Sequence, residues 1–560
     1  MSIVKNIENQ IKESLEKAAH KAKEAGELNF TTLPEYVLEV PREKAHGDFA
    51  ANMAMLLAKE AKMPPRKIAE IIVSNFDSAG TWVEKIEVAG PGFINFYLDN
   101  SWVYSVLPVI LDQGDDYGRS DFGKGKKVQV EFVSANPTGL LHMGNARGAA
   151  LGDSLASVLD AAGFDVSREF YINDAGNQIE KFARSLEARY LQLLGEDVPF
   201  PEDGYHGQDI IDTMQALIDR QGDKYKGMDG ELRRELLVKY ALEEKISGIR
   251  KTLEDFGVHY DVWFSEQTLH DSGEVADVVE KLKKDGHIYE KEGALWFNTT
   301  QFGDEKDEVV VRSNGVPTYF AADIAYHRNK FRRGFERVIN IWGADHHGHV
   351  ARMKGAVKAL GYDPEQLTVI LMQLVRLFQG GEILRMSKRT GTYVTLNELM
   401  EEIGRDAARY FFVMRSPDSQ MDFDLDLAKS QSADNPVFYV QYAHARICSI
   451  LRQAEEMGYH LPEVSQSDFR VLTDPSEMML MRKMADLPDE IVSAARNLAP
   501  HRMTSFAHDL ASLFHVFYTN CRVLTDEPEV RNARLLLTKA TGICIKNVLN
   551  LIGVSAPERM

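Results

Sequence analysis

The feature that most constrains the fold is a strand–loop–helix–strand pattern that occurs twice in the chain. In the first copy, residues 127–132 (KVQVEF) alternate like a strand, residues 133–143 form a loop, and residues 144–162 have helical spacing. Gly163 suits the end of this helix, and a second strand follows at 166–172. Such a unit is the building block of a doubly wound parallel sheet.

The second copy covers residues 337–374. A strand (VINIW) leads into a loop (GADHHG), a helix runs to Leu360 with Gly361 at its end, and another strand (LTVILMQL) follows. Two such units predict one parallel sheet built from two halves, in a Rossmann-like domain. The sequence between them, about 191–311, is mostly charged with helical spacing, and we expect it to be an insertion.

The length of 560 residues predicts about three or four domains. We expect an α+β N-terminal domain over residues 1–115, the Rossmann-like domain over 116–430, and a helical bundle over 431–560. The stretch 113–126 is rich in Gly and Asp, which is typical of a linker. The predicted fold class is therefore multidomain, α/β plus all-α.

Composition places the chain among cytoplasmic globular proteins. It has no signal-peptide pattern, no apolar run of membrane-spanning length, and cysteines only at 448, 521 and 544, a spacing that matches no zinc pattern. The net charge of −19 argues, taken alone, against nucleic-acid binding. Residues 431–560, however, carry 13 Lys and Arg against 15 Asp and Glu, so this region can still present a local basic face.

The first motif, Leu141-His-Met-Gly-Asn145, lies where the loop of the first unit enters its helix. Backbone N–H groups and the positive end of the helix dipole favour an anion there, and Gly144 permits close approach of a phosphate. His142 and Asn145 can donate hydrogen bonds to phosphoryl oxygens as negative charge develops. The alternative is that His142 only caps the helix or lies on the surface.

The second motif, Arg385 to Gly391 (RMSKRTG), follows the second unit, and Thr395 with Glu398 predicts a capping box just beyond it. A basic loop of this kind can close over the β- and γ-phosphates of a nucleotide. Alone, it is more typical of a solvated surface loop.

Together the two motifs resemble the His-Ile-Gly-His and Lys-Met-Ser-Lys-Ser signatures of class I aminoacyl-tRNA synthetases. Asn145 replaces the last His, and Arg385 and Arg389 replace the outer Lys and Ser, while the central Lys388 is retained. Longer blocks resemble the arginine enzyme of that class, and they extend over essentially the whole chain: residues 44–59, 131–148, 170–179, 317–327, 342–350, 437–446 and 551–560.

The resemblance implies an arginine pocket in which Tyr319 and Asp323 hold the guanidinium, Glu131 assists, and Ser134 and Asn136 meet the α-amino and carboxylate groups. A guanidinium has five donors in a planar fork, which calls for a carboxylate in bidentate geometry. Tyr319 and Asp323 are four residues apart and would share one face of a helix. The alternative for Asp323 is a simple ion pair with Arg328.

The resemblance also implies an ATP site. His142, Gly144, Asn145, Met386, Ser387 and Lys388 would meet the phosphates, with His142, Asn145 and Lys388 as the catalytic residues. Gly343 and Asp345 would lie against the adenosine, and Gln373 to Val375 would hold the adenine. ATP is expected to enter with Mg²⁺. His346, His347 and His349 suggest zinc, but their spacing does not match a zinc motif, so we expect no bound metal.

For RNA, the resemblance implies that Phe93 and Asn95 contact the D-loop of the tRNA, although Phe93 could equally belong to a core strand. The helical domain resembles the anticodon-binding domain named for an Asp-Ala-Leu-Arg motif, from which residues 532–535 (NARL) depart. Tyr442, His444, Arg446 and Met560 are the expected anticodon-loop contacts.

The expected function is ATP-dependent activation of L-arginine, followed by transfer of the arginyl group to the 3′-terminal adenosine of tRNA(Arg). We expect the enzyme to be a monomer. The resemblance also implies that the tRNA must be present before arginine is activated. Two alternatives remain open. One is a smaller nucleotidyltransferase, which would not need the helical domain, and the other is an inactive tRNA-binding paralogue.

Overall fold

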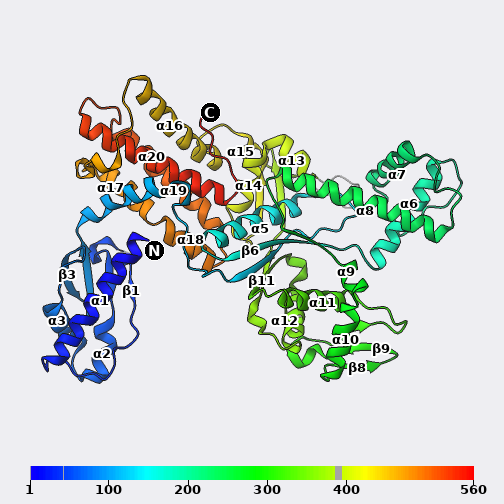
Figure 1. Ribbon diagram of the computed structural model, residues 1–560, viewed down its shortest axis with the longest axis horizontal. Helices are drawn as coiled ribbons and strands as arrows, with labels where there is room; N and C mark the ends of the chain where they lie inside the picture. Colours follow the sequence, from blue (N-terminus) through cyan, green and yellow to red (C-terminus); the bar gives the residue numbers. More distant parts are fainter. Residues whose placement is uncertain (1, 42, 385–393) are drawn as a thin grey trace.

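The computed structural model describes residues 2–41, 43–384 and 394–560 (Figure 1). The N-terminal part pairs an antiparallel sheet with three helices. The sheet has the order β1-β2-β4-β3, and its strands are β1 (Leu38–Glu39), β2 (Phe49–Ala51), β3 (Val83–Ala89) and β4 (Phe93–Leu98). The helices are α1 (Ile3–Glu24), α2 (Met53–Ala61) and α3 (Pro65–Asn75). Every second residue of β4 from Ile94 onward joins the hydrophobic core.

The predicted parallel sheet forms the centre of the molecule, and its order is β12-β11-β5-β6-β7. Its strands are β5 (Lys127–Glu131), β6 (Asp165–Ile172), β7 (Val262–Ser265), β11 (Arg337–Gly343) and β12 (Leu367–Met372). The chain runs from β5 to one side and later returns to pair β11 on the other side. The crevice beyond the carboxyl ends of β5 and β11 is therefore the place where such sheets bind ligands.

The helices of both predicted units form as expected. Helix α5 (Met143–Ala161) follows β5, and α12 (His347–Ala359) follows β11, starting inside the predicted loop. Gly163 and Gly361 lie just beyond their ends with positive φ angles of 86° and 90°, where a side chain would be strained. A third helix, α11 (Tyr319–Arg332), leads into β11.

The inserted sequence is only half helical, so the prediction of mostly helical structure was wrong for its second half. Helices α6 (Asn177–Leu193), α7 (Gln208–Gln221) and α8 (Gly230–Asp255) share a core of their own and project from the molecule (Figure 1). Next come β7 and the helices α9 (Gln267–Asp271) and α10 (Glu274–Lys284). The antiparallel sheet β8 (Ile288–Lys291), β9 (Ala294–Phe297) and β10 (Glu308–Val311) completes the stretch.

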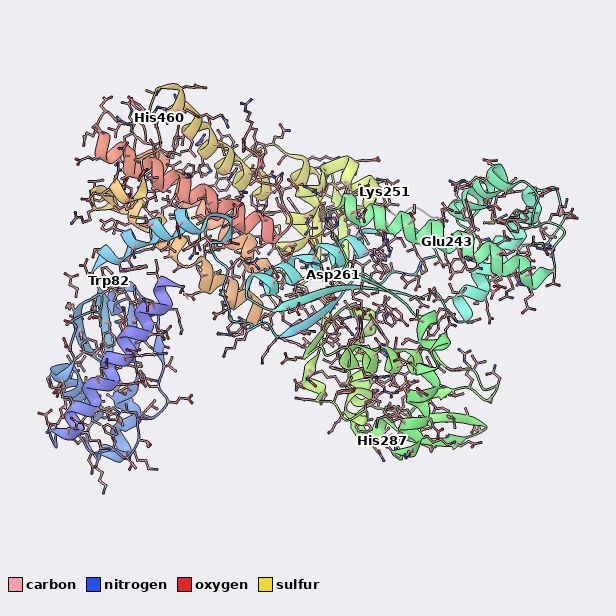
Figure 2. The ribbon with its side chains drawn as sticks, in the orientation of Figure 1. Trp82, Glu243, Lys251, Asp261, His287 and His460 are labelled. Carbon is pink, nitrogen blue, oxygen red and sulfur yellow. The ribbon has the colours of Figure 1, made fainter. Side chains whose placement is uncertain are left out.

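Asp261 attaches the middle of the inserted sequence to the central sheet. It lies at the entry to β7 and is labelled in Figure 2, as are Glu243 and Lys251 along α8. The Asp261 carboxylate accepts a hydrogen bond from the backbone N–H of Arg168 at 2.7 Å, and the Asp261 N–H donates to the Arg168 carbonyl at 2.9 Å. These bonds align β7 beside β6 as the edge strand.

A small subdomain connects the central sheet to the C-terminal bundle. It comprises the strands β13 (Val375–Gln379), β14 (Glu382–Leu384) and β15 (Met421–Asp424) and the helices α13 (Leu396–Ile403), α14 (Arg405–Val413) and α15 (Leu425–Lys429). The bundle contains α16 (Pro436–Glu456), α17 (Pro475–Ala485), α18 (Leu487–Arg496), α19 (His501–Asn520) and α20 (Pro528–Leu551). Cys521 and Cys544 are buried in it as free thiols, and Cys448 is half-buried.

The predicted linker is packed rather than free. Helix α4 (Val106–Gln113) lies against α20, and the Asn547 side chain donates hydrogen bonds to the carbonyls of Gly114 and Tyr117. The Tyr117 hydroxyl donates to the Met484 carbonyl at 2.9 Å. In the described parts of the chain, no helix combines the length and apolar character that a bilayer crossing needs.

Candidate active site

The start of α5 is held by a capping box in which His142 is the N-cap residue. Its Nδ1 accepts from the Gly144 N–H at 3.1 Å, and the Asn145 Oδ1 accepts from the His142 N–H at 3.0 Å. Since Nδ1 is an acceptor, the imidazole carries its proton on Nε2. Histidine capping was the alternative to a phosphate role, and the structure shows this cap, which fixes the ring at the helix start.

Thr395 lies beside this helix start. Thr395 forms an isolated β-bridge with His142, and the Leu396 N–H donates to the Leu141 carbonyl at 2.9 Å. The predicted capping box of Thr395 and Glu398 is confirmed and starts α13, which packs against α5. Met386, Ser387 and Lys388 lie outside the described residues, and the segment that contains them ends two residues before Thr395.

The end of β5 turns sharply into the crevice. Val133 and Ser134 have φ angles of 68° and 39°, in the left-handed region that side chains rarely adopt, and such strain is typical of functional sites. The Ser134 hydroxyl donates to Glu131 Oε1 at 2.9 Å and accepts from the Tyr171 N–H at 3.2 Å. Asn136, two residues on, is exposed.

Glu131 is neutralised by a lysine that the sequence did not single out. The Lys330 side chain has no exposed surface, and its ammonium lies 2.5 Å from Glu131 Oε2 and 2.9 Å from Asn340 Oδ1. The Asn340 amide in turn donates to Nε2 of His327, whose Nδ1–H donates to the Asp323 carbonyl. Burial lowers the pKa of His327 well below its usual value, which keeps the ring neutral. This buried chain ties β5 and β11 to α11.

Tyr319 and Asp323 lie on α11 and share one face, as predicted. The Asp323 carboxylate does not pair with Arg328. Its Oδ2 lies 3.0 Å from the His349 Nε2, so the alternative partner was wrong. The Asp323 side chain remains about a third exposed (34%), and Tyr319 is also exposed. Burial raises the pKa of Tyr319, so its hydroxyl stays protonated as a donor.

A second carboxylate contributes to the field around Asp323. Glu266, at the end of β7, is 3% exposed, and its pKa is raised by burial and by repulsion from Asp323. Since Lys330 cancels the charge of Glu131, Asp323 and Glu266 give this end of the crevice its negative character. Such a site can hold a buried cation with directed donors. Lys330, Asn340 and Glu266 come from separate segments, so no local motif indicated them, and His349 stood out only as a rejected zinc candidate.

The adenosine candidates lie at the ends of β11 and β12. The carboxylate of Asp345 lies close to the backbone of Gly343. A Cβ added to Gly343 would lie 2.4 Å from Asp345 Oδ1. The backbone of Gln373 and Val375 joins β12 to β13. His346 lies 3.3 Å from Asp345. Within the described ranges, no group of three or more His, Cys, Asp and Glu side chains could hold a metal ion.

Three family models match this chain in sequence. They are the "Arginyl tRNA synthetase N terminal domain" over residues 5–98, the "tRNA synthetases class I (R), catalytic domain" over 106–205 and 220–446, and the "DALR anticodon binding domain" over 440–560. Curated proteins named arginine–tRNA ligase are similar over their full length: 65% identity with that of Moorella thermoacetica and 64% with that of Heliobacterium modesticaldum, with 100% of both chains covered in each case. The chain belongs to the arginyl-tRNA synthetase family.

The solved structures agree with this membership at the level of the fold. The arginyl-tRNA synthetase of Thermus thermophilus matches with a TM-score of 0.71 at 24% identity, covering 98% of this chain and 100% of that one. The chain is therefore a class I aminoacyl-tRNA ligase that uses ATP. The alternative of a smaller nucleotidyltransferase is excluded, because the match includes the helical domain.

For this synthetase family member, the RNA-facing candidates differ in accessibility. Phe93 is half-buried at the start of β4, but Asn95 is 4% exposed between β2 and β3, so its amide has almost no surface for an RNA base. His444 is 7% exposed, and its Nδ1 lies 3.0 Å from the Pro557 carbonyl. Direct contact of Asn95 and His444 with RNA stays a prediction, for which both side chains have little exposed surface, and His444 contacts the C-terminal tail.

The remaining C-terminal candidates have accessible surface, and two of them, Tyr442 and Arg446, lie in contact. Tyr442 and Met560 are exposed, and the Arg446 guanidinium lies 4.6 Å from the centre of the Tyr442 ring. The same guanidinium lies 4.9 Å from the ring of Tyr518, an exposed residue of α19 that the sequence did not indicate. Aromatic rings around a cation offer stacking surfaces for unpaired bases.

Proposed function

We propose that this chain activates L-arginine with ATP and transfers the arginyl group to the 3′-terminal adenosine of tRNA(Arg). One observation carries the proposal. The start of α5 is bridged to Thr395, just beyond the Met-Ser-Lys segment, at the same sheet edge that presents Asp323. This arrangement supports a phosphate site and a guanidinium site at the same edge of the central sheet.

In the proposed ATP site, the α-phosphate lies at the start of α5. His142 Nε2–H and the Asn145 amide donate to its oxygens, and Gly144 permits the close approach. Lys388, with Met386 and Ser387, meets the β- and γ-phosphates, while Gly343, Asp345, Gln373 and Val375 surround the adenosine. Mg²⁺ enters with ATP as part of the substrate.

In the proposed arginine site, Asp323 accepts the guanidinium in bidentate geometry and Tyr319 donates or packs beside it. The guanidinium replaces His349 as the partner of Asp323. Ser134 and Asn136 meet the α-amino and carboxylate groups. Because Lys330 already neutralises Glu131, this glutamate assists by accepting hydrogen bonds rather than by supplying net charge.

The reaction follows from this arrangement. A carboxylate oxygen of arginine attacks the α-phosphorus in line, the bond to the β-phosphate oxygen breaks, and pyrophosphate leaves. The terminal 2′-hydroxyl of the tRNA then attacks the adenylate carbonyl and releases AMP. Catalysis consists of positioning and charge stabilisation by His142, Asn145 and Lys388, without a covalent enzyme intermediate.

The proposed domain roles extend this reaction to the whole tRNA. Residues 1–115 meet the D-loop through Phe93, residues 116–430 catalyse, with an insertion at about 191–311, and residues 431–560 bind the anticodon loop through Tyr442, Arg446 and Met560. The enzyme acts as a monomer in the cytoplasm.

The substitution Lys388→Ala tests the assignment of the phosphates. We expect the rate of adenylate formation to fall by about 100-fold or more, because a cation aimed at the developing charge is lost. Arginine affinity, measured by calorimetry, should stay within about twofold. An equal loss of the rate and of arginine affinity would contradict the role assigned to Lys388.

A further inference from the structure

Arg147, in the first turns of α5, is buried with no exposed surface, and it donates only to backbone carbonyls. Its Nη1 lies 2.7 Å from the Gln373 carbonyl and 3.1 Å from that of Ser419, and its Nη2 lies 2.9 Å from that of Ser416. Asp418 is near enough to act on this guanidinium electrostatically, but among the residues that the structure describes no carboxylate forms an ion pair with it. An unpaired buried cation is costly, so an arginine kept in this state requires an explanation.

A second buried arginine shows that the arrangement around Arg147 is unusual. Arg409 is equally buried and also packs against α5, where it donates to the carbonyls of Ile552, Phe256 and Gly257. Its Nη2, however, lies 2.6 Å from the carboxylate of Asp153. Arg409 thus has a compensating charge. Burial lowers the pKa of Arg147 to about 10, with the charge of Asp418 opposing the shift, and the guanidinium stays charged at neutral pH.

The carbonyls that Arg147 holds belong to two loops at the sheet edge. Gln373 lies between β12 and β13, and its N–H donates to the Pro417 carbonyl at 2.9 Å, so both of its backbone polar groups are fixed. Met421, beyond the second loop, donates to the Leu374 carbonyl. The two loops therefore support one another, and Arg147 ties both to the helix that begins at His142.

This link spans the two ends of the proposed nucleotide site. The proposed function assigns the phosphates to the start of α5 and the adenine to Gln373–Val375. The Arg147 hydrogen bonds fix the position of that segment relative to α5. Gly148, the next residue of α5, approaches the Met372 side chain, where an added Cβ would be 3.6 Å from the methyl carbon. The helix and the end of β12 thus already lie in contact at this point.

We propose that Arg147 is a positioning residue for ATP, which sets the spacing between the phosphate-binding start of α5 and the adenine-binding segment Gln373–Val375. This inference rests on the proposed assignment of ATP to that crevice. Arg147 does not touch the substrate. It acts through the backbone of Gln373, and it has no corresponding link to Asp323 or Tyr319.

The test uses Arg147→Met and Arg147→Lys, assayed by ATP–pyrophosphate exchange in the full-length enzyme with tRNA present. We expect Arg147→Met to raise the KM for ATP at least about tenfold while the KM for arginine stays within about twofold. Arg147→Lys keeps the charge but cannot reach three carbonyls with a rigid fork, so its KM for ATP should be intermediate. If Arg147→Met does not fold, Arg147→Lys alone still provides the comparison.

Arg409→Lys is the matched control, because it alters an equally buried arginine against the same helix. It should lower the thermal midpoint of unfolding without changing the KM for ATP. Parallel increases in both KM values for Arg147→Lys, or an equal increase in the KM for ATP for Arg409→Lys, would overturn the proposal.

His142→Asn separates failure of this inference from failure of the proposed function. If His142→Asn slows adenylate formation and Arg147→Lys leaves the KM for ATP unchanged, only the positioning role falls. If neither variant alters the use of ATP, the assignment of ATP to this crevice falls with it.

Discussion

At the scale of single residues, charge balance explains the arginine pocket. Two carboxylates at one sheet edge would repel each other, but Lys330 neutralises Glu131 from within the core, at 2.5 Å. About a third of the Asp323 side chain is exposed. Burial and the charge of Asp323 together raise the pKa of the nearby Glu266. The crevice therefore presents negative charge where a guanidinium would enter.

The substitution Asp323→Asn tests the role of that carboxylate. We expect the KM for arginine to rise by about 100-fold or more, because charge-assisted hydrogen bonds worth about 3 kcal/mol are lost. The KM for ATP should change less than about twofold. As a control, Asp285→Asn alters an exposed carboxylate just after α10, where its partner is Lys281. An unchanged KM for arginine in Asp323→Asn would place the guanidinium elsewhere.

The pair of Glu131 and Lys330 makes a prediction about stability. Lys330→Met leaves a buried carboxylate unpaired and should lower the free energy of unfolding by about 3–5 kcal/mol. Adding Glu131→Gln should restore most of that loss, since the amide carries no charge. Chemical denaturation of the single and double variants measures both effects. A double variant no more stable than Lys330→Met would show that the two residues do not compensate each other.

The residues of the site were predictable only where the signal was local. The helix start at His142 and the face shared by Tyr319 and Asp323 follow from short-range spacing. Lys330 and Glu266 carry no such signal, because a lysine within α11 and a glutamate after β7 become neighbours of the crevice only through the fold. Burial of Asn95 and His444 likewise depends on elements distant in sequence.

At the scale of secondary-structure elements, the parallel sheet followed from periodicity, while the short strands did not. The strand β7 has four residues (VWFS) beside a long charged helix, too few for a pattern to indicate a strand. The hairpin of β8 and β9 did have a usable signal. Glu292 and Gly293 form its two-residue turn with φ angles of 53° and 74°, as type I′ turns require.

The capping geometry of α5 separates two roles of His142. His142→Asn keeps a good N-cap side chain, so the free energy of unfolding should change by less than about 0.5 kcal/mol. The rate of adenylate formation should nevertheless fall by about 100-fold, because the Nε2–H donor is lost. Thermal unfolding and single-turnover assays measure the two quantities. An asparagine variant with a normal rate would reduce His142 to a helix cap.

At the scale of the whole molecule, the N-terminal domain rests against the helical bundle through polar contacts. Arg482 of α17 lies 3.1 Å from Asp48, and the Ser2 hydroxyl donates to Asp489 at 2.7 Å. A cavity of about 650 Å³ lies between the domains, and Asp486 is among its lining residues. Because these polar contacts lie at the junction, a change of charge there should alter the stability of the assembled chain.

Asp486 makes the stability of this junction dependent on pH. Asp486 keeps exposed surface, but desolvation by neighbouring protein atoms raises the pKa of its carboxyl to about 6, with Lys483 and Arg482 opposing the shift and Asp489 and Glu490 adding to it. The folded state therefore binds the proton more tightly than the unfolded chain, and stability falls as the pH rises from about 4 to about 6.

The substitution Asp486→Asn should remove the loss of stability that accompanies ionisation of this carboxyl. We expect its thermal midpoint to exceed that of the wild type at pH 7–8, and the difference should vanish near pH 4, where both side chains are neutral. Thermal unfolding across this pH range measures the difference. A constant difference between pH 4 and pH 8 would exclude titration of Asp486 as its cause.

The most direct test of the account is ATP–pyrophosphate exchange by the wild-type protein, measured with each amino acid in the presence and absence of tRNA(Arg). We expect exchange with arginine and with no other amino acid, and only when the tRNA is present. Absence of exchange under every condition would indicate an inactive tRNA-binding paralogue, and exchange with a different amino acid would contradict the guanidinium site at Asp323.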